Sequence, residues 1–325
     1  MGAMTSRDPD QHGIDLDLRV RQVRWEADGV VSLILEDPAG NPLPQWAPGS
    51  HLDLHLPGGL TRNYSLSGDP ADRQSWRVAV LREPAGRGGS AYVHDELRAG
   101  QVLAAHGPRN NFSLRPAESY LFIAGGIGIT PILPMVRRAQ ADGTPWRLLY
   151  GGRQRASMAF LPELEAYGDA VTVWPQDERG LLPLADVLAD PVPGGLVYCC
   201  GPGALMAAVE EAMDRWPPES LVIERFAPVA APPDEHGAAF EVEARRSGVT
   251  ALVGDGVSVL ATLEAAGVEI PNSCREGICG TCETRILEGT ADHRDSLLSD
   301  EERASMQTMM VCVSRSGGPR LVLDV

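Results

Sequence analysis

The sequence CREGICGTC at residues 274–282 places three cysteines in one short loop, and Cys312 follows after 29 further residues. Four residues separate Cys274 from Cys279, and two separate Cys279 from Cys282. This is the ligand spacing of a plant-type 2Fe-2S cluster, in which four thiolates hold two irons. We therefore interpret these four cysteines as cluster ligands.

Two glycines in the same loop, Gly277 and Gly280, fit a cluster because residues without a Cβ let backbone N–H groups approach the sulfurs. A zinc site usually pairs two short ligand knuckles, whereas Cys312 has no close second ligand. A disulfide needs an oxidising compartment, which no targeting segment indicates. We rank both alternatives lower. Cys199 and Cys200 end an apolar strand, where cysteine is usually a small buried hydrophobe, and we do not assign them to the metal.

The composition describes a packed protein of several domains. Its 325 residues exceed one ordinary domain and predict two or three. Hydrophobic residues make up 43% and charged residues 22%, as in globular proteins rather than disordered or fibrous chains. With 28 Lys and Arg against 44 Asp and Glu, the net charge is −16. Nucleic acids are therefore poor partners, because they attract basic surfaces.

The longest apolar run, at residues 119–136, is interrupted by three glycines and two prolines. It is better explained as a strand, a glycine loop and a helix than as a membrane span. Residues 1–12 are polar and lack the apolar core of a secretory signal. We therefore expect a cytoplasmic protein without a membrane partner.

Changes in pattern divide the chain into three domains and a linker. Residues 1–114 contain short β-type runs between Pro, Gly and Asp turns, which predicts a small antiparallel β-barrel. Residues 115–226 alternate strands with helices, which predicts an α/β domain with a parallel sheet. Residues 227–238 contain three prolines and no periodicity, so we expect a linker there. Residues 239–325 form the last domain, with a hairpin at 240–244 and 249–252, a helix at 257–266 and the cysteine loop.

Two glycine-rich turns follow strands of the predicted parallel sheet. The first, GGIGITP at residues 125–131, opens a helix, where backbone amides can approach a phosphate at the positive helix end. The second, CCGPG at residues 199–203, also ends a strand and precedes a helix. Both lie at the carboxyl ends of strands, where open α/β sheets bind ligands, and together they predict a nucleotide site. The GxGxxG fingerprint is absent, however, and such turns also occur purely for packing.

The barrel carries a candidate flavin site in the sequence RNYS at residues 62–65. Arg62 can bind the phosphate of FMN, the Tyr64 ring can pack on the isoalloxazine, and Ser65 can hydrogen-bond near its N5. Strict alternation puts Arg62 and Tyr64 on one face and Ser65 on the other, so the serine contact requires a bend or the main chain. The sequence GRGGS at residues 86–90 is a second phosphate cradle. The alternatives are an exposed arginine beside a packing tyrosine, and a flexible glycine turn.

Taken in order, RNYSL, GRGGS, GGIGITP, YCCGPGALM and CREGICGTC with the later VCVSR resemble phthalate dioxygenase reductase and its relatives over nearly the whole chain. Similar modules occur free or fused to haem-thiolate monooxygenases. The resemblance implies a flavin-binding barrel, a nicotinamide-binding α/β domain and a β-grasp 2Fe-2S ferredoxin domain, in that order. Its cofactors would be FMN rather than FAD, NADH and the cluster.

The resemblance also implies contacts for individual residues. Those implied for FMN are Arg62, Tyr64, Ser65, Ala79, Val80, Leu81, Gly88, Gly89, Ser90, Thr130 and Phe226. Those implied for NAD are Gly125, Gly126, Ile127, Gly128, Pro131, Cys200, Gly201 and Pro202. Ser65, Cys200 and Glu224 would act at the reaction itself, by placing the nicotinamide C4 over the flavin N5. Relatives have a small residue between this glutamate and the following aromatic, whereas Arg225 lies there in this chain, which would change nicotinamide access.

The implied reaction passes from a two-electron transfer to one-electron transfers. NADH gives two electrons together as a hydride, the cluster accepts one at a time, and the flavin mediates. A terminal oxygenase or demethylase, of Rieske or haem-thiolate type, would be the protein partner that takes the electrons. The alternatives are a free flavin reductase or diaphorase and a flavin and iron–sulfur redox sensor. Arg153 and Arg155 could pair with the 2′-phosphate of NADPH, yet the resemblance favours NADH.

Overall fold

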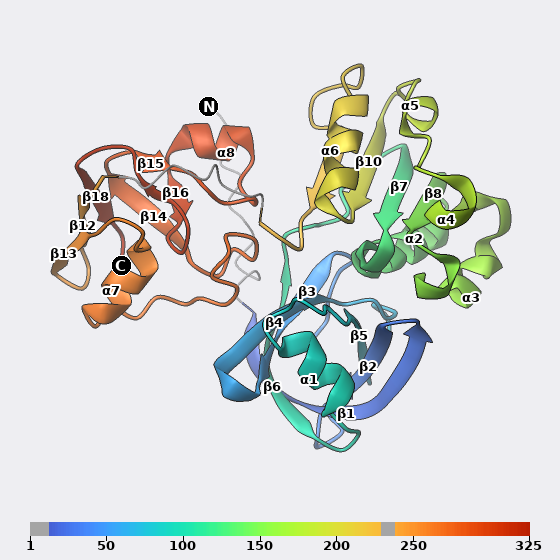
Figure 1. Ribbon diagram of the computed structural model, residues 1–325, viewed down its shortest axis with the longest axis horizontal. Helices are drawn as coiled ribbons and strands as arrows, with labels where there is room; N and C mark the ends of the chain where they lie inside the picture. The colour runs from blue at the N-terminus through green and yellow to red at the C-terminus, as the bar shows by residue number, and fades with distance from the viewer. Residues whose placement is uncertain (1–12, 229–237) are drawn as a thin grey trace. The chain divides into compact units, whose positions relative to one another are not determined.

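The computed structural model describes residues 13–228 and 238–325 (Figure 1). The chain divides into two compact units, Met1–Glu224 and Arg225–Val325. Most of the linker expected at residues 227–238, and the polar residues 1–12, lie outside the described residues. The domain boundaries expected at 114, 226 and 238 remain predictions.

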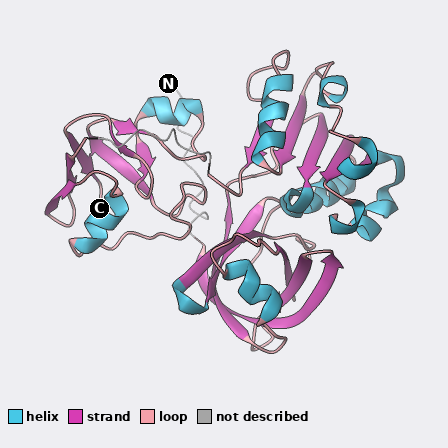
Figure 2. Cartoon of the chain, in the orientation of Figure 1, coloured by secondary structure: helices cyan, strands magenta, loops and turns pink. Residues whose placement is uncertain are grey.

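The first sheet of unit Met1–Glu224 is antiparallel, with the strand order β4-β3-β6-β1-β2-β5. Figure 2 draws the strands of the chain in magenta. Leu66 forms a bridge with Val78, which joins the two ends of this order and closes the sheet into a barrel. Alternate residues such as Leu52 and Leu54 point into its core, as the two-residue period of a strand requires. The predicted antiparallel barrel is confirmed. Its elements are β1 (Ile14–Ala27), β2 (Val30–Glu36), β3 (Ser50–Leu56), η2 (Pro57–Gly59), β4 (Leu60–Ser65), β5 (Trp76–Leu81), α1 (Gly89–Asp95) and β6 (Val102–Asn110).

The second sheet of this unit is parallel, with the order β11-β10-β7-β8-β9. Successive residues of β7 face different cores, because Phe122 packs with helix α2 and Ile123 packs with helices α5 and α6. Helices therefore cover both faces of the sheet, and the predicted α/β class is confirmed. Its elements are β7 (Ser119–Gly125), η3 (Gly126–Gly128), α2 (Ile129–Asp142), β8 (Trp146–Gly152), η4 (Arg155–Ser157), α3 (Leu161–Leu164), η5 (Glu165–Ala170), β9 (Val171–Pro175), α4 (Gln176–Arg179), α5 (Leu184–Val187), β10 (Gly195–Cys200), α6 (Gly203–Ala212) and β11 (Leu221–Glu224).

The apolar run at residues 119–136 folds as β7, η3 and the start of α2, which is the strand, loop and helix that its glycines and prolines predict. None of the helices in the described residues is both long enough and apolar enough to cross a membrane.

The barrel and the parallel sheet share one hydrophobic core. The barrel residues Ala27, Val30, Ala79 and Phe112 belong to the same buried cluster as side chains of β7, β8, β10 and α2. The barrel and the parallel sheet are therefore packed against each other within one unit.

Unit Arg225–Val325 contains a mixed sheet with the order β13-β12-β18-β14-β16. β12 pairs antiparallel with β13, as the expected hairpin does, and parallel with β18. Ser258 caps the helix that follows, because its side chain accepts a hydrogen bond from the Ala261 N–H. The elements are β12 (Phe240–Ala244), β13 (Val249–Val253), α7 (Val259–Ala265), β14 (Glu283–Glu288), β15 (Ala291–Asp292), α8 (Asp300–Ser305), β16 (Thr308–Met310), β17 (Arg315–Ser316) and β18 (Arg320–Leu323).

Candidate functional site

The four cysteines of the expected cluster are buried and converge in pairs. Cys279 hydrogen-bonds with Cys274, and Cys312 hydrogen-bonds with both Cys282 and Cys274. Each side chain belongs to a residue at most 8% exposed, and none of the six cysteines of the chain forms a disulfide. Residues separated by up to 38 positions in the sequence thus bring their sulfurs to one place.

The loop directs backbone donors at these sulfurs. The Glu276 N–H lies 3.3 Å from Cys274 Sγ, and the Gly277 backbone hydrogen-bonds Cys312. Gly277 has φ +71°, and a Cβ there would lie 2.6 Å from Val313 Cγ2 and 3.0 Å from Asp295 Cα. A glycine is therefore required both by the conformation and by the close approach of the neighbouring chain.

The donor set fits a two-iron group better than a single ion. Among the described residues, no three His, Cys, Asp or Glu side chains are arranged to hold one metal ion. The Cys279–Cys274, Cys312–Cys282 and Cys312–Cys274 contacts instead link four sulfurs, which is the number of thiolates that a two-iron cluster takes. The hydrogen bond with Cys274, and then burial, raise the pKa of the Cys279 thiol. Iron would remove this penalty, because a coordinating thiol is deprotonated by the metal charge.

In the barrel, Arg62 lies against the start of α1. A Cβ on Gly89 would approach Arg62 Cγ and Nε within 2.8 Å, so the guanidinium fits closely over this glycine. Arg62 donates to the Thr61 carbonyl at 2.8 Å and to the Arg87 carbonyl at 3.3 Å. The structure thus brings together the two expected phosphate elements, RNYS and GRGGS. Within the latter, the Ser90 hydroxyl accepts the Glu83 N–H at 3.0 Å, and its own proton is left to donate.

β5 carries the expected flavin contacts Ala79, Val80 and Leu81 at the end of the strand order. Beyond the Leu66–Val78 bridge, its outer edge pairs with no other strand among the described residues. The Val80 side chain points into the barrel core, whereas Ala79 belongs to the core shared with the nucleotide sheet. Only backbone groups of this segment are therefore suited to hydrogen-bond a flavin.

The three residues expected at the reaction meet at one end of the parallel sheet. Cys200 and Glu224 are register partners at the ends of β10 and β11, and Ser65 at the end of β4 hydrogen-bonds the Glu224 carboxyl. Burial raises the pKa of Glu224 to about 8, although the Ser65 hydrogen bond lowers it. Glu224 Oε2 is buried and has no hydrogen-bond partner among the described residues. It is an acceptor or donor that remains available to a ligand.

Other expected residues are placed less decisively. Burial raises the pKa of Tyr64 to about 12, so its phenol stays neutral. Thr130 is buried, and its hydroxyl donates to the Ile127 carbonyl at 2.9 Å. Pro131 is buried in the first turn of α2. Phe226 is 40% exposed and belongs to the second unit, so its place near the flavin remains a prediction.

The two glycine turns pack against each other. A Cβ on Gly128 would lie 2.2 Å from the Cys200 carbonyl oxygen, and one on Gly125 would lie 2.8 Å from Pro202 Cδ and 3.4 Å from Gly201 Cα. Packing alone therefore explains Gly125 and Gly128. Gly126 differs, because it has φ +55° and open space where a Cβ would stand. It is the glycine of this turn that leaves its backbone open to a ligand.

Sequence reasoning missed Tyr150 on β8, whose side chain hydrogen-bonds this turn. Its phenol donates to the Gly126 carbonyl at 3.2 Å, and burial raises its pKa. No sequence pattern distinguishes this residue from an ordinary core tyrosine.

Comparisons with known proteins agree with this geometry. Residues 122–211 match the family model of the oxidoreductase NAD-binding domain, and residues 242–316 match that of the 2Fe-2S iron-sulfur cluster binding domain. Phenoxybenzoate dioxygenase subunit beta of Ectopseudomonas oleovorans is 44% identical, with 95% of this chain and 97% of the relative covered. The solved structure of phthalate dioxygenase reductase is also similar, with a TM-score of 0.72 and 36% identity. The match covers 96% of this chain and 98% of that one. That protein is a modular structure for electron transfer from pyridine nucleotides to 2Fe-2S.

This chain belongs to the phthalate dioxygenase reductase family. The three predicted fold classes and the predicted cofactors FMN, NADH and 2Fe-2S are those of this family. A type IV self-sufficient cytochrome P450 monooxygenase contains a similar part, with TM-score 0.89 and 42% identity over 99% of this chain but 43% of that chain. Phthalate dioxygenase reductase modules thus occur as separate chains and within larger proteins.

Proposed function

We propose that this chain is the reductase component of an oxygenase system. It takes electrons from NADH through FMN to its 2Fe-2S cluster and passes them singly to a terminal oxygenase or demethylase, of Rieske or haem-thiolate type. One observation carries this proposal. A single chain of this family contains both a group of four converging thiols and a place where the elements expected to bind flavin and nicotinamide meet. The nicotinamide donor and the reduced thiols favour a cytoplasmic location.

Bound FMN would supply the step from a two-electron hydride to single electrons. In the proposed mechanism, the residues of the chain bind and orient the two groups. Arg62 holds the phosphate, and Ser65, Cys200 and Glu224 hold the nicotinamide ring against the flavin and exclude water. Burial, and then the nearby Glu224, raise the pKa of Cys200 well above its usual range, so this thiol stays neutral beside the ring. Orientation of this kind is a large part of the rate of a transfer between two bound groups.

Flavin reduction by NADH is expected to slow as pH rises through about 8, the pKa of Glu224. The flavin gains negative charge on reduction, which a protonated Glu224 tolerates and an ionised one opposes. Glu224→Gln should keep the fast rate at all pH values, as measured by anaerobic stopped-flow absorbance. Glu211→Gln, an exposed change on α6, should keep the wild-type profile. A profile that persists unchanged in Glu224→Gln would contradict this role.

The choice of NADH over NADPH is supported by the surroundings of Arg155. Its Nε lies 3.0 Å from Glu178 Oε1 and its Nη2 lies 3.2 Å from Glu178 Oε2. The guanidinium is thus already engaged by a carboxylate, just beyond the ends of β8 and β9. A 2′-phosphate would meet the Glu178 charge as well as the arginine, whereas a ribose hydroxyl would not be repelled.

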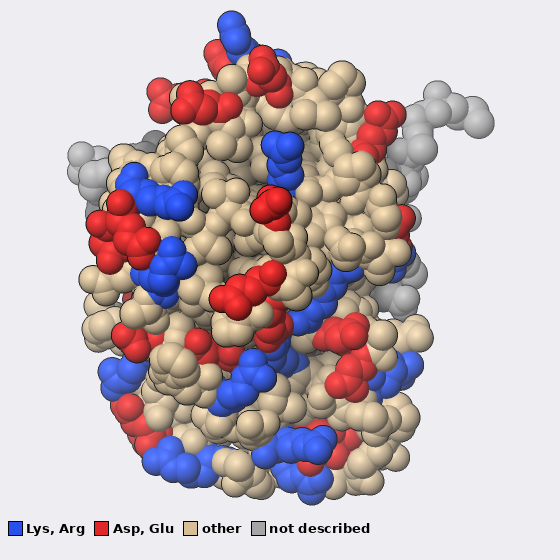
Figure 3. All heavy atoms as spheres, turned by 90° about the vertical axis from the view of Figure 1, so that its right-hand side faces the viewer, with Lys and Arg blue, Asp and Glu red and all other residues tan. Residues whose placement is uncertain are grey.

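The acidic second unit favours a partner with a basic docking surface. Residues 239–325 contain fourteen Asp and Glu against eight Arg. On the face of the molecule that Figure 3 shows, acidic and basic side chains are intermixed without a patch of one sign. Complementary charge accelerates the encounter of two proteins.

Electron delivery to the basic protein cytochrome c is therefore expected to fall about 10-fold as salt is raised from low to physiological ionic strength. Steady-state reduction of cytochrome c by NADH measures this, with an uncharged quinone as the matched acceptor whose reduction should not change. Equal salt dependence for both acceptors would show that surface charge has no part in docking.

A further inference from the structure

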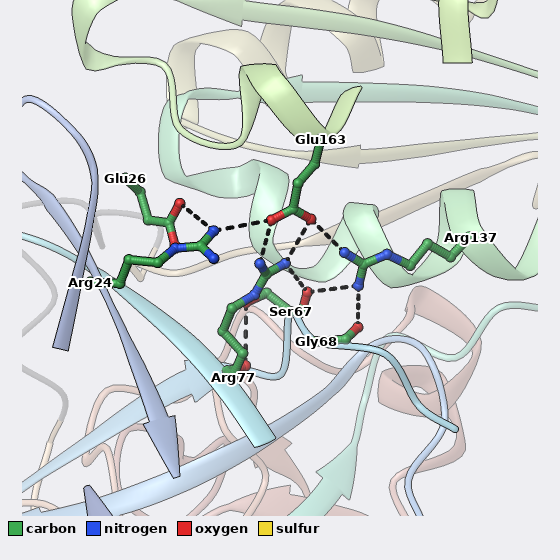
Figure 4. Close-up of polar contacts among 7 residues, drawn as sticks. All are labelled: Arg24, Glu26, Ser67, Gly68, Arg77, Arg137 and Glu163. Carbon is green, nitrogen blue, oxygen red and sulfur yellow. Dashed lines mark hydrogen bonds and ion pairs between the residues drawn. The ribbon is translucent and has the colours of Figure 1, made fainter. Parts of the chain in front are cut away.

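Glu163 on α3 receives three arginines (Figure 4). Arg77 donates to both of its oxygens, at 2.5 and 3.2 Å. Arg137 reaches Oε2 at 2.5 Å, and Arg24 reaches Oε1 at 3.3 Å. No sequence pattern singles out these four residues, which lie as far as 139 positions apart.

The arginines come from the elements that carry the two cofactor sites. Arg77 lies on β5, two residues before the flavin segment that begins at Ala79. Arg137 lies on α2, the helix that starts directly after the glycine turn at Gly126–Gly128. Glu163 therefore connects the strand next to the flavin with the helix behind the nicotinamide turn.

The local backbone holds Glu163 in this place. Phe160 precedes α3 with φ +63°, a conformation that a bulky residue seldom adopts. The Glu163 N–H bonds the Phe160 carbonyl at 3.1 Å, and the Arg77 guanidinium stacks over the Phe160 ring at 4.5 Å from its centroid. One side of Arg77 thus binds an aromatic ring while its end binds the carboxylate.

The same arginines also hold the chain that follows β4. Arg77 donates to the Ser67 carbonyl at 2.7 Å, and Arg137 donates to the Gly68 carbonyl at 2.5 Å. This segment lies just after Ser65, the residue that hydrogen-bonds Glu224. The arginines that bind Glu163 thus connect β5, α2 and the segment that follows β4.

The charges make Glu163 the central member. Its side chain is 27% exposed, and the Arg77 side chain only 10%, so water screens their attraction less than at the surface. Burial alone would raise the pKa of Glu163, but the Arg77 hydrogen bond and the charges of Arg77, Arg137 and Arg24 outweigh it and lower the pKa. Among the described residues, the other carboxylate that pairs with these arginines is Glu26, which binds Arg24 at 2.8 Å.

We propose that Glu163 is a positioning residue for hydride transfer, which aligns the nicotinamide site with the flavin site by clamping β5 to α2. This rests on the proposed function, in which NADH reduces a bound flavin. Hydride transfer is sensitive to alignment, because a misplacement of about 1 Å costs on the order of 100-fold in rate. The shared hydrophobic core and the Asp28–Ala156 backbone bond of 2.9 Å hold the two parts together without Glu163, so we expect its loss to loosen alignment rather than unfold the chain.

The test is Glu163→Gln in the FMN-loaded and cluster-loaded protein, with anaerobic stopped-flow reduction by NADH. The limiting rate of flavin bleaching should fall about 10-fold or more, while the Kd for NADH changes little. The kinetic isotope effect with NADH deuterated at the transferred position should persist or grow. Asp142→Asn is the matched control, because it breaks the exposed Arg138–Asp142 ion pair of 2.6 Å on α2, the helix that carries Arg137. Its limiting rate of flavin bleaching should equal that of wild type.

A melting temperature that falls while the limiting rate stays at the wild-type value would overturn the proposal, since Glu163 would then be structural only. If Glu163→Gln does not fold, Glu163→Asp keeps the charge with a shorter reach, and the proposal requires a reduced limiting rate there too. Wild-type protein whose flavin NADH does not bleach would refute the proposed function instead. Flavin, iron and labile sulfide content per chain should be equal in all variants, which separates loss of alignment from loss of a cofactor.

Discussion

Cys312→Ala is expected to lower the rate of NADH-driven cytochrome c reduction by at least about 100-fold, while the reduction of ferricyanide continues. Cys312 pairs with Cys282 in the buried sulfur group, so its loss leaves one iron with an incomplete ligand set. Ferricyanide takes electrons directly from a flavin, and it therefore reports on the proposed NADH and FMN sites, whose expected residues other than Phe226 belong to unit Met1–Glu224. Steady-state kinetics with the two acceptors measure both activities in one preparation.

The ferricyanide activity is the internal control for folding of the flavin and nicotinamide unit. Undiminished cytochrome c reduction by Cys312→Ala would mean that electrons bypass the cluster. The chain would then act as a free flavin reductase or diaphorase, the alternative that its sequence leaves open. Failure of NADH to bleach the flavin on a catalytic timescale would favour the redox sensor.

Arg62→Gln is expected to weaken FMN binding by about 10- to 100-fold, because a charge-assisted hydrogen bond to the phosphate is lost. Riboflavin has no phosphate, so its affinity should not change, and the variant should bind both flavins alike. Quenching of flavin fluorescence by the flavin-free protein measures both affinities.

Arg98→Gln is the matched control, because Arg98 lies in the same barrel and its guanidinium donates to the backbone carbonyls of Leu97 and Asp95. It should bind FMN as wild type does. FMN affinity that survives in Arg62→Gln would show that the phosphate lies elsewhere, and GRGGS alone would then be the cradle.

The sequence was sufficient for the features that depend on local spacing. The spacing and alternation of residues along the sequence are enough to indicate the four cysteines, the antiparallel and parallel sheets, and the strand, loop and helix at residues 119–136. Alternation also places Ser65 on the face opposite Arg62 and Tyr64, and there it meets Glu224. Its contact with the flavin remains a prediction.

Features that depend on approach between distant segments could not be predicted. The turn at GGIGITP looks like a phosphate site, yet Gly125 and Gly128 are required by the second turn that packs on them. The helical segment of α3 and η5 at residues 161–170 is irregular, because Phe160 precedes it in a left-handed conformation and Gly168 leaves the helical region. The Glu163 clamp has no sequence signature, since arginines and glutamates at these spacings are usually solvated.

The decisive measurement is low-temperature EPR of the dithionite-reduced protein, with iron, acid-labile sulfide and flavin analysis of the same sample. We expect a rhombic signal, two irons and two sulfides per chain and one FMN, as a plant-type cluster beside a flavin requires. Zinc in place of iron, or a preparation without labile sulfide, would contradict the electron path on which the proposed function depends.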